Sequence, residues 1–405
     1  MNLYYFISKK IQSARRDSFT YIVRIISILS IAVGLAVIIV SYGILEGFRS
    51  NIQEKIFSFA SHIQVSKYDI SRSYEEAPIK LNSDLYRNAG DIKNLAHIQS
   101  FIKKPGLLKT EQEVMGAVLK GVGPDYNIKK FSRNIIQGSF ISLSDSAYSR
   151  DILISNKISR KLRLEVGDSV MIYFVQNPPR FRKLIVKGIY QTGLEEFDDL
   201  MIIGDLRLIQ RINNWPDTLV GGYEIFVKDF NKLDQVSEDV FDMMDYDMQL
   251  EKVTDKYLQI FDWLTLLNRN VVIFLILILF VASFNMVSTL FIMIMERTNM
   301  IGMLKALGAN NSQIRNIFLL NGLFIIIRGM LWGNLIGIGF CLIQYYFKII
   351  PLDPENYYMS SVPIEWNWQI FVGINILTFV LISVVLMVPV LVVSRIKPVK
   401  SIKFS

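Results

Sequence analysis

Side chains that commonly perform catalytic or metal chemistry are scarce in this chain of 405 residues. The sequence has two histidines, His62 and His97, and a single cysteine, Cys341. The histidines are too far apart to make a metal-ligand pattern, and no cysteine lies near either of them. The sequence also lacks the G-x-S-x-G motif of nucleophilic serines and the G-x-x-x-x-G-K-[ST] phosphate loop. We therefore predict a non-catalytic chain with no metal site and no ATP site of its own.

An acidic run could in principle bind a cation. Glu195, Glu196, Asp198 and Asp199 lie close together in the sequence. Carboxylates are good ligands for hard cations, but their spacing here does not match a calcium-binding loop. We interpret the run as a solvated loop, with a cation site as the alternative.

Four charge-poor apolar blocks account for the mean hydropathy of +0.34. They are Ile25–Leu45, Asn270–Met295, Gly329–Phe347 and Ile370–Ser394. Each is long enough to cross about 30 Å of hydrocarbon as a helix that rises about 1.5 Å per residue. The sequence thus excludes a soluble globular protein. It predicts a polytopic α-helical membrane protein with four transmembrane helices, one before and three after a large α+β extracytoplasmic domain.

Charge predicts the orientation of these spans. The segment before Ile25, the segment between the second and third spans, and the C-terminal tail are rich in Lys and Arg, and Asp17 and Glu296 are their only acids. Because basic flanks stay on the cytoplasmic side, both termini are predicted to be cytoplasmic and the domain between the first two spans to lie outside. The pI of 9.2 then reflects topology and indicates no nucleic-acid partner.

The spans and their flanks divide the chain into consecutive segments. The predicted segments are a cytoplasmic amphipathic segment (1–24), transmembrane helix 1 (25–45), the external domain with its stalk (46–269), transmembrane helix 2 (270–295), a cytoplasmic helix and re-entry (296–318), transmembrane helix 3 (319–347), an external loop (348–369), transmembrane helix 4 (370–394) and a cytoplasmic tail (395–405).

Apolar runs with interspersed helical stretches predict an α+β fold for the external domain. A helical stretch is expected near Asp84–Lys103, and Lys252–Asn270 has helical periodicity that should continue into the second span as a stiff stalk. The strand-like runs are His62–Tyr68, Val114–Val122, Asp151–Ile154, Ser169–Val175, Lys183–Tyr190, Leu200–Ile203 and Tyr223–Val227, with short helices at Ser155–Leu164 and Asp205–Ile212.

Polar and small residues in or next to the spans could serve either helix packing and membrane placement or a functional site. Gly329, Gly333 and Gly337 share one helix face and favour close packing against a neighbouring helix. Arg328 precedes them, and we expect it at the cytoplasmic interface, where its stem can snorkel, in preference to a functional intramembrane site. Asn285 lies within the second span, where it either bonds to a neighbouring helix or faces a substrate cavity. The sequence leaves that choice open.

The segment Glu296–Phe318 predicts a short amphipathic helix on the cytoplasmic face. Ile301, Leu304 and Leu307 form its apolar stripe, a glycine-containing break follows, and Ser312 is expected to cap the next helix. Such a helix suits the docking of a cytoplasmic partner, and the alternative is a plain interfacial re-entry.

Motifs along nearly the whole chain resemble a known family. Met295–Ala309 resembles the coupling-helix segment of FtsX-like ABC-transporter permeases, and the one-plus-three span order is that of MacB-type permeases. Within this group the chain is most similar to the membrane subunits, LolC and LolE, of lipoprotein-releasing transporters. Further stretches that support the resemblance are Ile28–Phe48, His62 with Ile63, Gly167 with Asp168, Gly188–Tyr190, Thr192–Leu194, Phe284–Met286, Asn321 with Gly322, and Lys397 with Pro398.

The resemblance implies a partner-dependent mechanism in the bacterial inner membrane. Two such permeases, identical or different, would pair and bind two separate ATPase subunits, which hold the ATP and Mg²⁺. Movement of the ATPases would pass through the coupling helix, and lipoproteins would leave the membrane for a periplasmic chaperone. The implied ATPase contact is Glu296, Arg297, Ile301, Leu304, Lys305 and Gly308. The implied border of the lipid cavity is Gly47, Phe48, Phe284, Asn285 and Met286.

The resemblance also implies a chaperone-binding hairpin, here called the hook, which should be shorter than in the family. It would comprise Asn177, Pro178, Pro179, Arg180 and Phe181. Two other functions stay open. One is FtsX-like mechanotransmission that regulates a cell-wall hydrolase, and the other is MacB-like efflux of peptides or small molecules.

Overall fold

The computed structural model describes residues 19–69, 74–143, 148–353 and 359–393. Residues 1–18 of the predicted N-terminal segment, and the predicted tail 395–405, lie outside the described residues. The chain divides into two compact units, which we describe separately. The helical unit consists of Met1–Ser50, Trp263–Leu352 and Ser360–Ser405, and the α/β unit consists of Asn51–Asp262 with Asp353–Met359.

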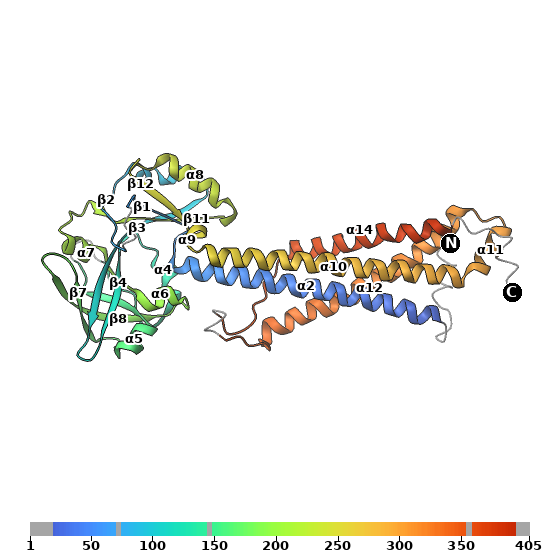
Figure 1. Cartoon of the computed structure of the whole chain (residues 1–405), viewed down its shortest axis with the longest axis horizontal. Helices are drawn as coiled ribbons and strands as arrows, with labels where there is room; N and C mark the ends of the chain where they lie inside the picture. The colour runs from blue at the N-terminus through green and yellow to red at the C-terminus, as the bar shows by residue number, and fades with distance from the viewer. Residues whose placement is uncertain (1–18, 70–73, 144–147, 354–358, 394–405) are drawn as a thin grey trace. The chain divides into compact units, whose positions relative to one another are not determined.

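Four described helices are long and apolar enough to cross a membrane, as predicted. They are α2 (Phe19–Phe59), α10 (Leu258–Glu296), α12 (Asn311–Phe347) and α14 (Trp368–Val393), drawn in Figure 1. Most of the predicted stalk forms the beginning of α10. Residues near its start belong to a separate short helix, α9 (Val253–Lys256), which ends just before α10 begins. A further short helix, α11 (Thr298–Ala306), connects α10 to α12.

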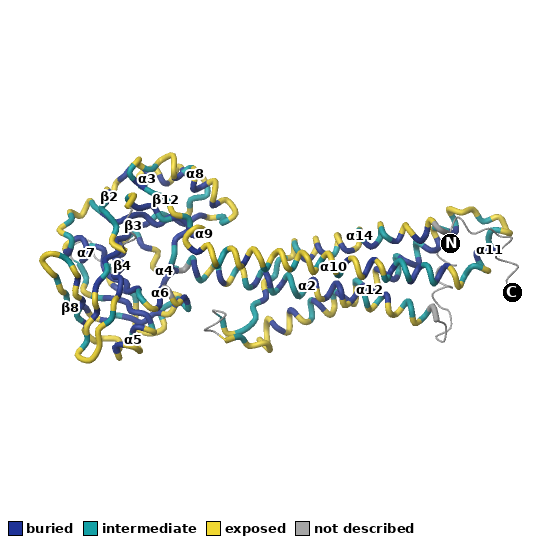
Figure 2. The backbone as a smooth tube through the Cα atoms, in the orientation of Figure 1, coloured by how far each residue is buried: buried dark blue, intermediate teal, exposed yellow. Residues whose placement is uncertain are grey.

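The helical unit buries one face of each long helix and exposes the other. Apolar side chains from α2, α10, α12 and α14 meet in a common cluster that includes Ile31, Met286, Phe318 and Leu386. Figure 2 shows buried and exposed positions alternating along these helices. The exposed positions include large apolar side chains such as Phe280, which is 70% exposed. An apolar outer surface of this extent is suited to lipid and would be a liability in water.

A glycine face of α12 sets how closely α2 can approach. A Cβ atom at Gly329 would lie 2.8 Å from the Cβ of Ile31, and one at Gly333 would lie 2.9 Å from the backbone oxygen of Ala32. Real Cβ atoms do not come so close, so the absence of side chains at these positions is what allows the contact. Close approach matters in lipid because helix association there relies on packing instead of on the release of water.

The α/β unit is built around a ten-stranded mixed sheet with the order β12-β1-β11-β3-β4-β9-β6-β8-β5, while β7 pairs with β3 and β8. Only the β4–β9 and β6–β8 pairs are parallel. The strands of this sheet are β1 (Ile63–Lys67), β3 (Leu95–Lys109), β4 (Val114–Val122), β5 (Ile135–Gly138), β6 (Asp151–Ser155), β7 (Ser169–Phe174), β8 (Arg180–Tyr190), β9 (Met201–Asp205), β11 (Gly222–Val227) and β12 (Met248–Lys252). The strands β2 (Ile79–Lys80) and β10 (Leu219–Val220) pair in a separate two-stranded sheet.

Short helices cover the sheet, and two of them follow a strand directly, as predicted. Those two, α5 (Asn156–Leu162) and α7 (Leu206–Asn213), are capped by Ser155 and Asp205 at the strand ends. The others are α3 (Asp84–Arg87), α4 (Ile128–Phe131), α6 (Glu195–Leu200) and α8 (Leu233–Met243).

The helical stretch predicted near Asp84–Lys103 is wrong for most of its length. Only α3 and a single 3₁₀ turn at Ala89–Asp91 are helical there, and Asn94 adopts a left-handed conformation with φ 63° just before β3 begins. The strand β3 lies between β11 and β4, and both neighbours supply its backbone hydrogen bonds. Long-range pairing therefore overrides the local helical pattern, as β-propensity arguments allow.

The glycine contact between α2 and α12 can be tested by substitution. Gly333→Val should force its methyl groups against Ala32 and Leu35, and we expect a loss of about 1–3 kcal/mol of stability from overpacking. The measurement is thermal unfolding of the purified chain in detergent. Gly339→Val is the matched control, since nothing lies within 4 Å of a Cβ there. Equal stability of the two variants would contradict the close contact.

Candidate functional site

The junction between α10 and α12 holds α11, the helix that the sequence predicts to dock a cytoplasmic partner. Ile301 of α11 is fully buried and packs in the same cluster as Ile294 and Ile314. On the opposite side, Met303 is 62% exposed and Leu307 is 80% exposed. The helix is therefore anchored through one side chain and presents apolar side chains to its surroundings.

The remaining residues of the predicted contact surround this helix. Glu296 is exposed, Leu304 and Lys305 are partly buried, and Gly308 ends the segment with a positive φ of 93°. The Nε atom of Arg297 is buried and has no hydrogen-bond partner in the described part of the chain. A buried donor without a partner is costly, so the local packing around Arg297 carries an energetic penalty.

The cap of the following helix differs from the prediction. We expected Ser312 to begin the second helix, but α12 begins at Asn311 with Asn310 as its N-cap. The backbone N–H of Asn310 donates to Oε1 of Gln313 at 2.8 Å. This reciprocal arrangement satisfies a donor that would otherwise be orphaned at the helix start, which explains why the helix begins two residues earlier.

The predicted border of the lipid cavity is not assembled within the helical unit. Asn285 donates to the hydroxyl of Ser30 at 2.8 Å, Met286 is fully buried in the common cluster, and Phe284 is 63% exposed. Gly47 lies against the backbone of Pro363, where a Cβ would come within 2.5 Å of its oxygen. Gly47 is 17 residues along α2 from Ser30, or about 25 Å.

Phe48, the fifth of these residues, is half-buried next to Gly47. The observed bond of Asn285 is the helix–helix interaction that the sequence left as one of two choices. A second such bond joins Ser27 to Thr289 on the same two helices. Hydrogen bonds of this kind satisfy polar groups that have no water partner in lipid.

The hook is a tight connection between β7 and β8. The guanidinium of Arg180 donates to the backbone oxygen of Ile212 at 2.6 Å and to Oδ1 of Asn214 at 3.0 Å, which fastens it to the end of α7. Asn177, Pro178 and Pro179 are exposed at the tip. Val175 and Phe181, at its base, are 83% and 59% exposed. The connection therefore presents apolar groups on a fixed base.

The acidic run is not the solvated loop that we expected. Its residues begin the helix α6, and Asp198 is buried. Its carboxylate accepts from the backbone and hydroxyl of Thr192 and from the backbone of Gly193 at 2.8–3.1 Å. Lys157 neutralises Glu195 and Asp199 at 3.1 Å and 3.2 Å. Across the described residues, no group of three or more His, Cys, Asp or Glu side chains could hold a metal ion.

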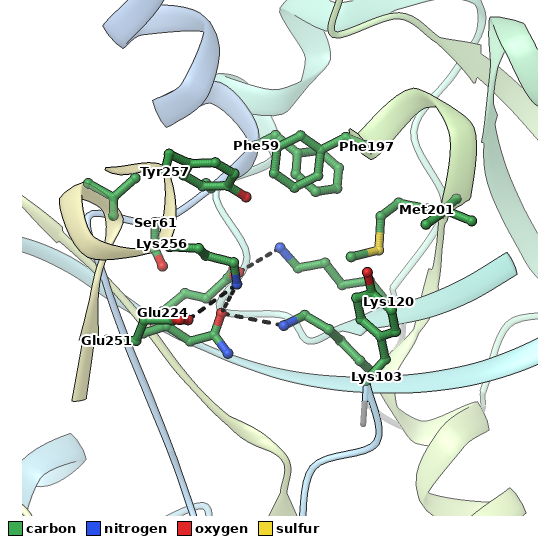
Figure 3. Close-up of a pocket in the computed structure, with 15 residues that line it drawn as sticks. Phe59, Ser61, Lys103, Lys120, Phe197, Met201, Glu224, Glu251, Lys256 and Tyr257 are labelled. Carbon is green, nitrogen blue, oxygen red and sulfur yellow. Dashed lines mark hydrogen bonds and ion pairs between the residues drawn. The ribbon is translucent and has the colours of Figure 1, made fainter. Parts of the chain in front are cut away.

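A small cavity of about 70 Å³ lies within the α/β unit, where α2 ends and α9 begins (Figure 3). Phe59, the last residue of α2, faces Phe197 with ring centroids 4.1 Å apart. The charged side chains of the cavity wall are Lys103, Lys120, Glu224, Glu251 and Lys256. The end of α2, the helix α9 and charged side chains of β3, β4, β11 and β12 thus meet at one charged centre inside this unit.

Lys120 and Glu224 form a buried ion pair in this wall. Their charged atoms lie 2.7 Å apart, and the side chains are 2% and 4% exposed. Burial by itself would raise the pKa of Glu224, but Lys120 and the amide of Gln99 outweigh burial and lower it. Burial lowers the pKa of Lys120, and Glu224 opposes that shift. The pair links the central strands β3, β4 and β11.

The other two lysines of the cavity are also paired. Lys103 lies 3.1 Å from a carboxylate oxygen of Glu76, and Lys256 lies 3.4 Å from one of Glu251. Because each lysine has a carboxylate partner, the cavity is balanced in charge. It is better suited to holding strands in register than to binding an anion.

His62 also has a structural role. Its Nδ1 atom accepts from the backbone N–H of Val227 at 2.8 Å, and Phe57 packs edge-on against its ring with centroids 4.2 Å apart. Burial, with a smaller contribution from Lys130, lowers the pKa of His62 to about 3. The ring is therefore neutral at physiological pH and joins β1 to β11.

Sequence reasoning missed the Lys120–Glu224 pair, although a signal was present. Each is a single charge within an otherwise apolar strand, β4 or β11. An isolated charge in a strand that is buried on both faces needs an opposite charge nearby. The sequence could have suggested the pair, whereas its geometry depends on the order of the strands.

Comparisons with known proteins agree with this architecture. A model of the MacB-like periplasmic core domain matches residues 25–240, and one of the FtsX-like permease C-terminal matches residues 272–398. The lipoprotein-releasing system transmembrane protein LolC of Xylella fastidiosa is 23% identical, with 97% of each chain covered. LolE of Haemophilus influenzae is 22% identical, with 91% of each covered. The crystal structure of the periplasmic region of MacB from Actinobacillus actinomycetemcomitans aligns with a TM-score of 0.34 and 12% identity, covering 51% of this chain and 95% of that chain.

One span, an α/β domain and three further spans define a membrane permease, and the predicted fold class is confirmed. The matched regions together extend over most of the sequence, and the first alone covers more than half of it. The chain therefore belongs to the family of FtsX-like permeases with a MacB-like periplasmic core domain. Members of this family are non-catalytic permease subunits of ABC transporters.

The buried ion pair of the α/β unit can be tested with a double-mutant cycle. Lys120→Met should cost about 3–5 kcal/mol of stability because it leaves Glu224 buried without its partner. The double variant Lys120→Met with Glu224→Leu should recover most of that loss. The measurement is unfolding of the purified chain in detergent. Equal losses in the single and double variants would show that the two charges do not interact.

Proposed function

We propose that this chain is a permease subunit of an ATP-driven transporter that extracts lipoproteins from the bacterial inner membrane and transfers them to a periplasmic chaperone. The observation that carries the proposal is similarity along nearly the full length to relatives named for lipoprotein release. This similarity includes the spans, the α/β unit and the segment between α10 and α12. It therefore supports a shared function better than similarity in one domain alone would.

The α11 segment supports a separate ATPase partner on the cytoplasmic side. It exposes Met303 and Leu307, and it places the unpaired Nε atom of Arg297 nearby. Exposed apolar side chains, methionine among them, beside an arginine are typical of a protein contact. The ATP and Mg²⁺ would be bound by that partner, since the sequence has no phosphate loop.

Charge supports the orientation. The basic segments at both chain ends and around α11 would lie in the cytoplasm, which puts the α/β unit in the periplasm. In that orientation α11 faces the ATPase, and the exposed hook faces the compartment of the chaperone. The exposed side chains of Val175 and Phe181 would be the first contacts for it.

A second permease would complete the lipid cavity. Gly47 and Phe284 lie at different depths, and Phe284 is exposed on the outer face of α10. Gly47 and Phe284 can still border one cavity if a second permease with the same span order supplies the opposite wall. The partner is either a second copy of this chain or a related permease.

The cargo can be tested by depletion of the protein in its own cell. We expect outer-membrane lipoproteins to accumulate in the inner membrane, as measured by membrane fractionation and mass spectrometry of acylated proteins. Affinity purification in mild detergent should recover an ATPase together with acylated lipoproteins. Normal lipoprotein sorting with no related permease present would overturn the proposal. Recovery of a cell-wall hydrolase or of an efflux-channel adaptor would favour the two other functions.

The ATPase contact can be tested separately from the cargo. Leu307→Asp adds a charge to an 80% exposed apolar side chain, so it should detach the ATPase and leave the permease folded. The measurement is the amount of ATPase that co-purifies with the permease. Ile349→Asp is the matched control, since Ile349 is 61% exposed after the other end of α12. Full retention of the ATPase by Leu307→Asp would show that this face is not the contact.

A further inference from the structure

A groove on the helical unit combines basic and aromatic side chains with apolar walls. It lies between α2 and α12 and has a volume of about 450 Å³, which is enough for a lipid headgroup and its glycerol. Its polar and aromatic lining consists of Tyr21, Arg24, Arg328 and Trp332. The apolar lining includes Ile28 and Leu29.

The two arginines give the groove its charge. Arg328 is exposed and has neither an acidic nor a hydrogen-bond partner among the residues that the structure describes. The guanidinium of Arg24 lies 5.4 Å from the centroid of the Tyr21 ring. Guanidinium groups bind phosphate oxygens well because their donors match the geometry of the oxygens.

The depth of Arg328 favours an anionic partner. A Cβ at the adjacent Gly329 would lie 3.2 Å from the backbone oxygen of Ile28, so Arg328 is level with that turn of α2. Ile28 is only three residues into the first apolar block, or about 5 Å. A cation at this depth is costly without a counter-charge. Trp332 and Tyr21 are also typical of a membrane interface.

We infer that this groove binds the phosphate of an anionic phospholipid such as phosphatidylglycerol. Arg24 and Arg328 hold the phosphate oxygens, and an acyl chain follows the apolar wall along Leu29 and Trp332. The spans of a second copy of this chain would bring no counter-charge, because its four apolar blocks contain no acidic residue. The inference requires only that the helices lie in a bilayer, and it does not rest on the proposed function.

The test is native mass spectrometry of the full chain titrated with phosphatidylglycerol or phosphatidylcholine. The first phosphatidylglycerol should bind more tightly than the first phosphatidylcholine. Arg328→Gln should weaken that first binding about fivefold, the contribution of one arginine near a membrane surface. Arg315→Gln is the matched control, since it makes the same change on the same helix outside the groove, and it should bind as the parent protein does.

A charge-preserving variant separates binding from folding. Arg328→Lys should retain most of the preference for phosphatidylglycerol. Equal affinity for the two lipids in the parent protein would overturn the inference. Equal weakening by Arg328→Gln and Arg315→Gln would also overturn it, because the preference would then come from general surface charge.

Discussion

The need to satisfy every backbone polar group inside hydrocarbon constrains the whole chain. In lipid a single segment meets this need only as a helix, so each crossing is helical. The α/β unit lies between the first and second crossings, and α2 and α10 therefore have to lead into it and out of it. Both exceed the length that a bilayer requires, with 41 and 39 residues. Their extra turns end at Phe59 and begin at Leu258, beside the charged cavity of the α/β unit.

Association of the helices depends on fit and on a few polar bonds. Lipid tails compete equally for apolar surface, so hydrophobicity alone cannot select one arrangement of helices. The glycine face of α12 brings α2 close, and the bond between Asn285 and Ser30 fixes α10 against α2. The same close contact places Arg328 beside α2, next to Arg24. Packing that stabilises the bundle therefore also creates the basic groove.

The α/β unit is held by contacts between distant parts of the sequence. Its central strand β3 pairs with β11, which lies far along the chain, and Lys120 on β4 reaches Glu224 on β11. A buried ion pair adds little stability compared with apolar side chains in the same place. A buried charge that has lost its partner, however, is strongly destabilising. The pair therefore penalises any strand order that does not place β4 and β11 on the two sides of β3, and it adds specificity to the apolar pairing.

The sequence by itself determined the features that depend on composition and short-range pattern. The four spans, most strands and the glycine face follow from hydropathy and periodicity, which act locally. Tertiary structure decided which pattern prevailed where elements compete. It turned the expected helix before Lys103 into β3, buried Asp198 in place of a solvated loop, and joined Arg24 to Arg328 in one groove. These outcomes depend on partners far away in the sequence, whose positions no local pattern encodes.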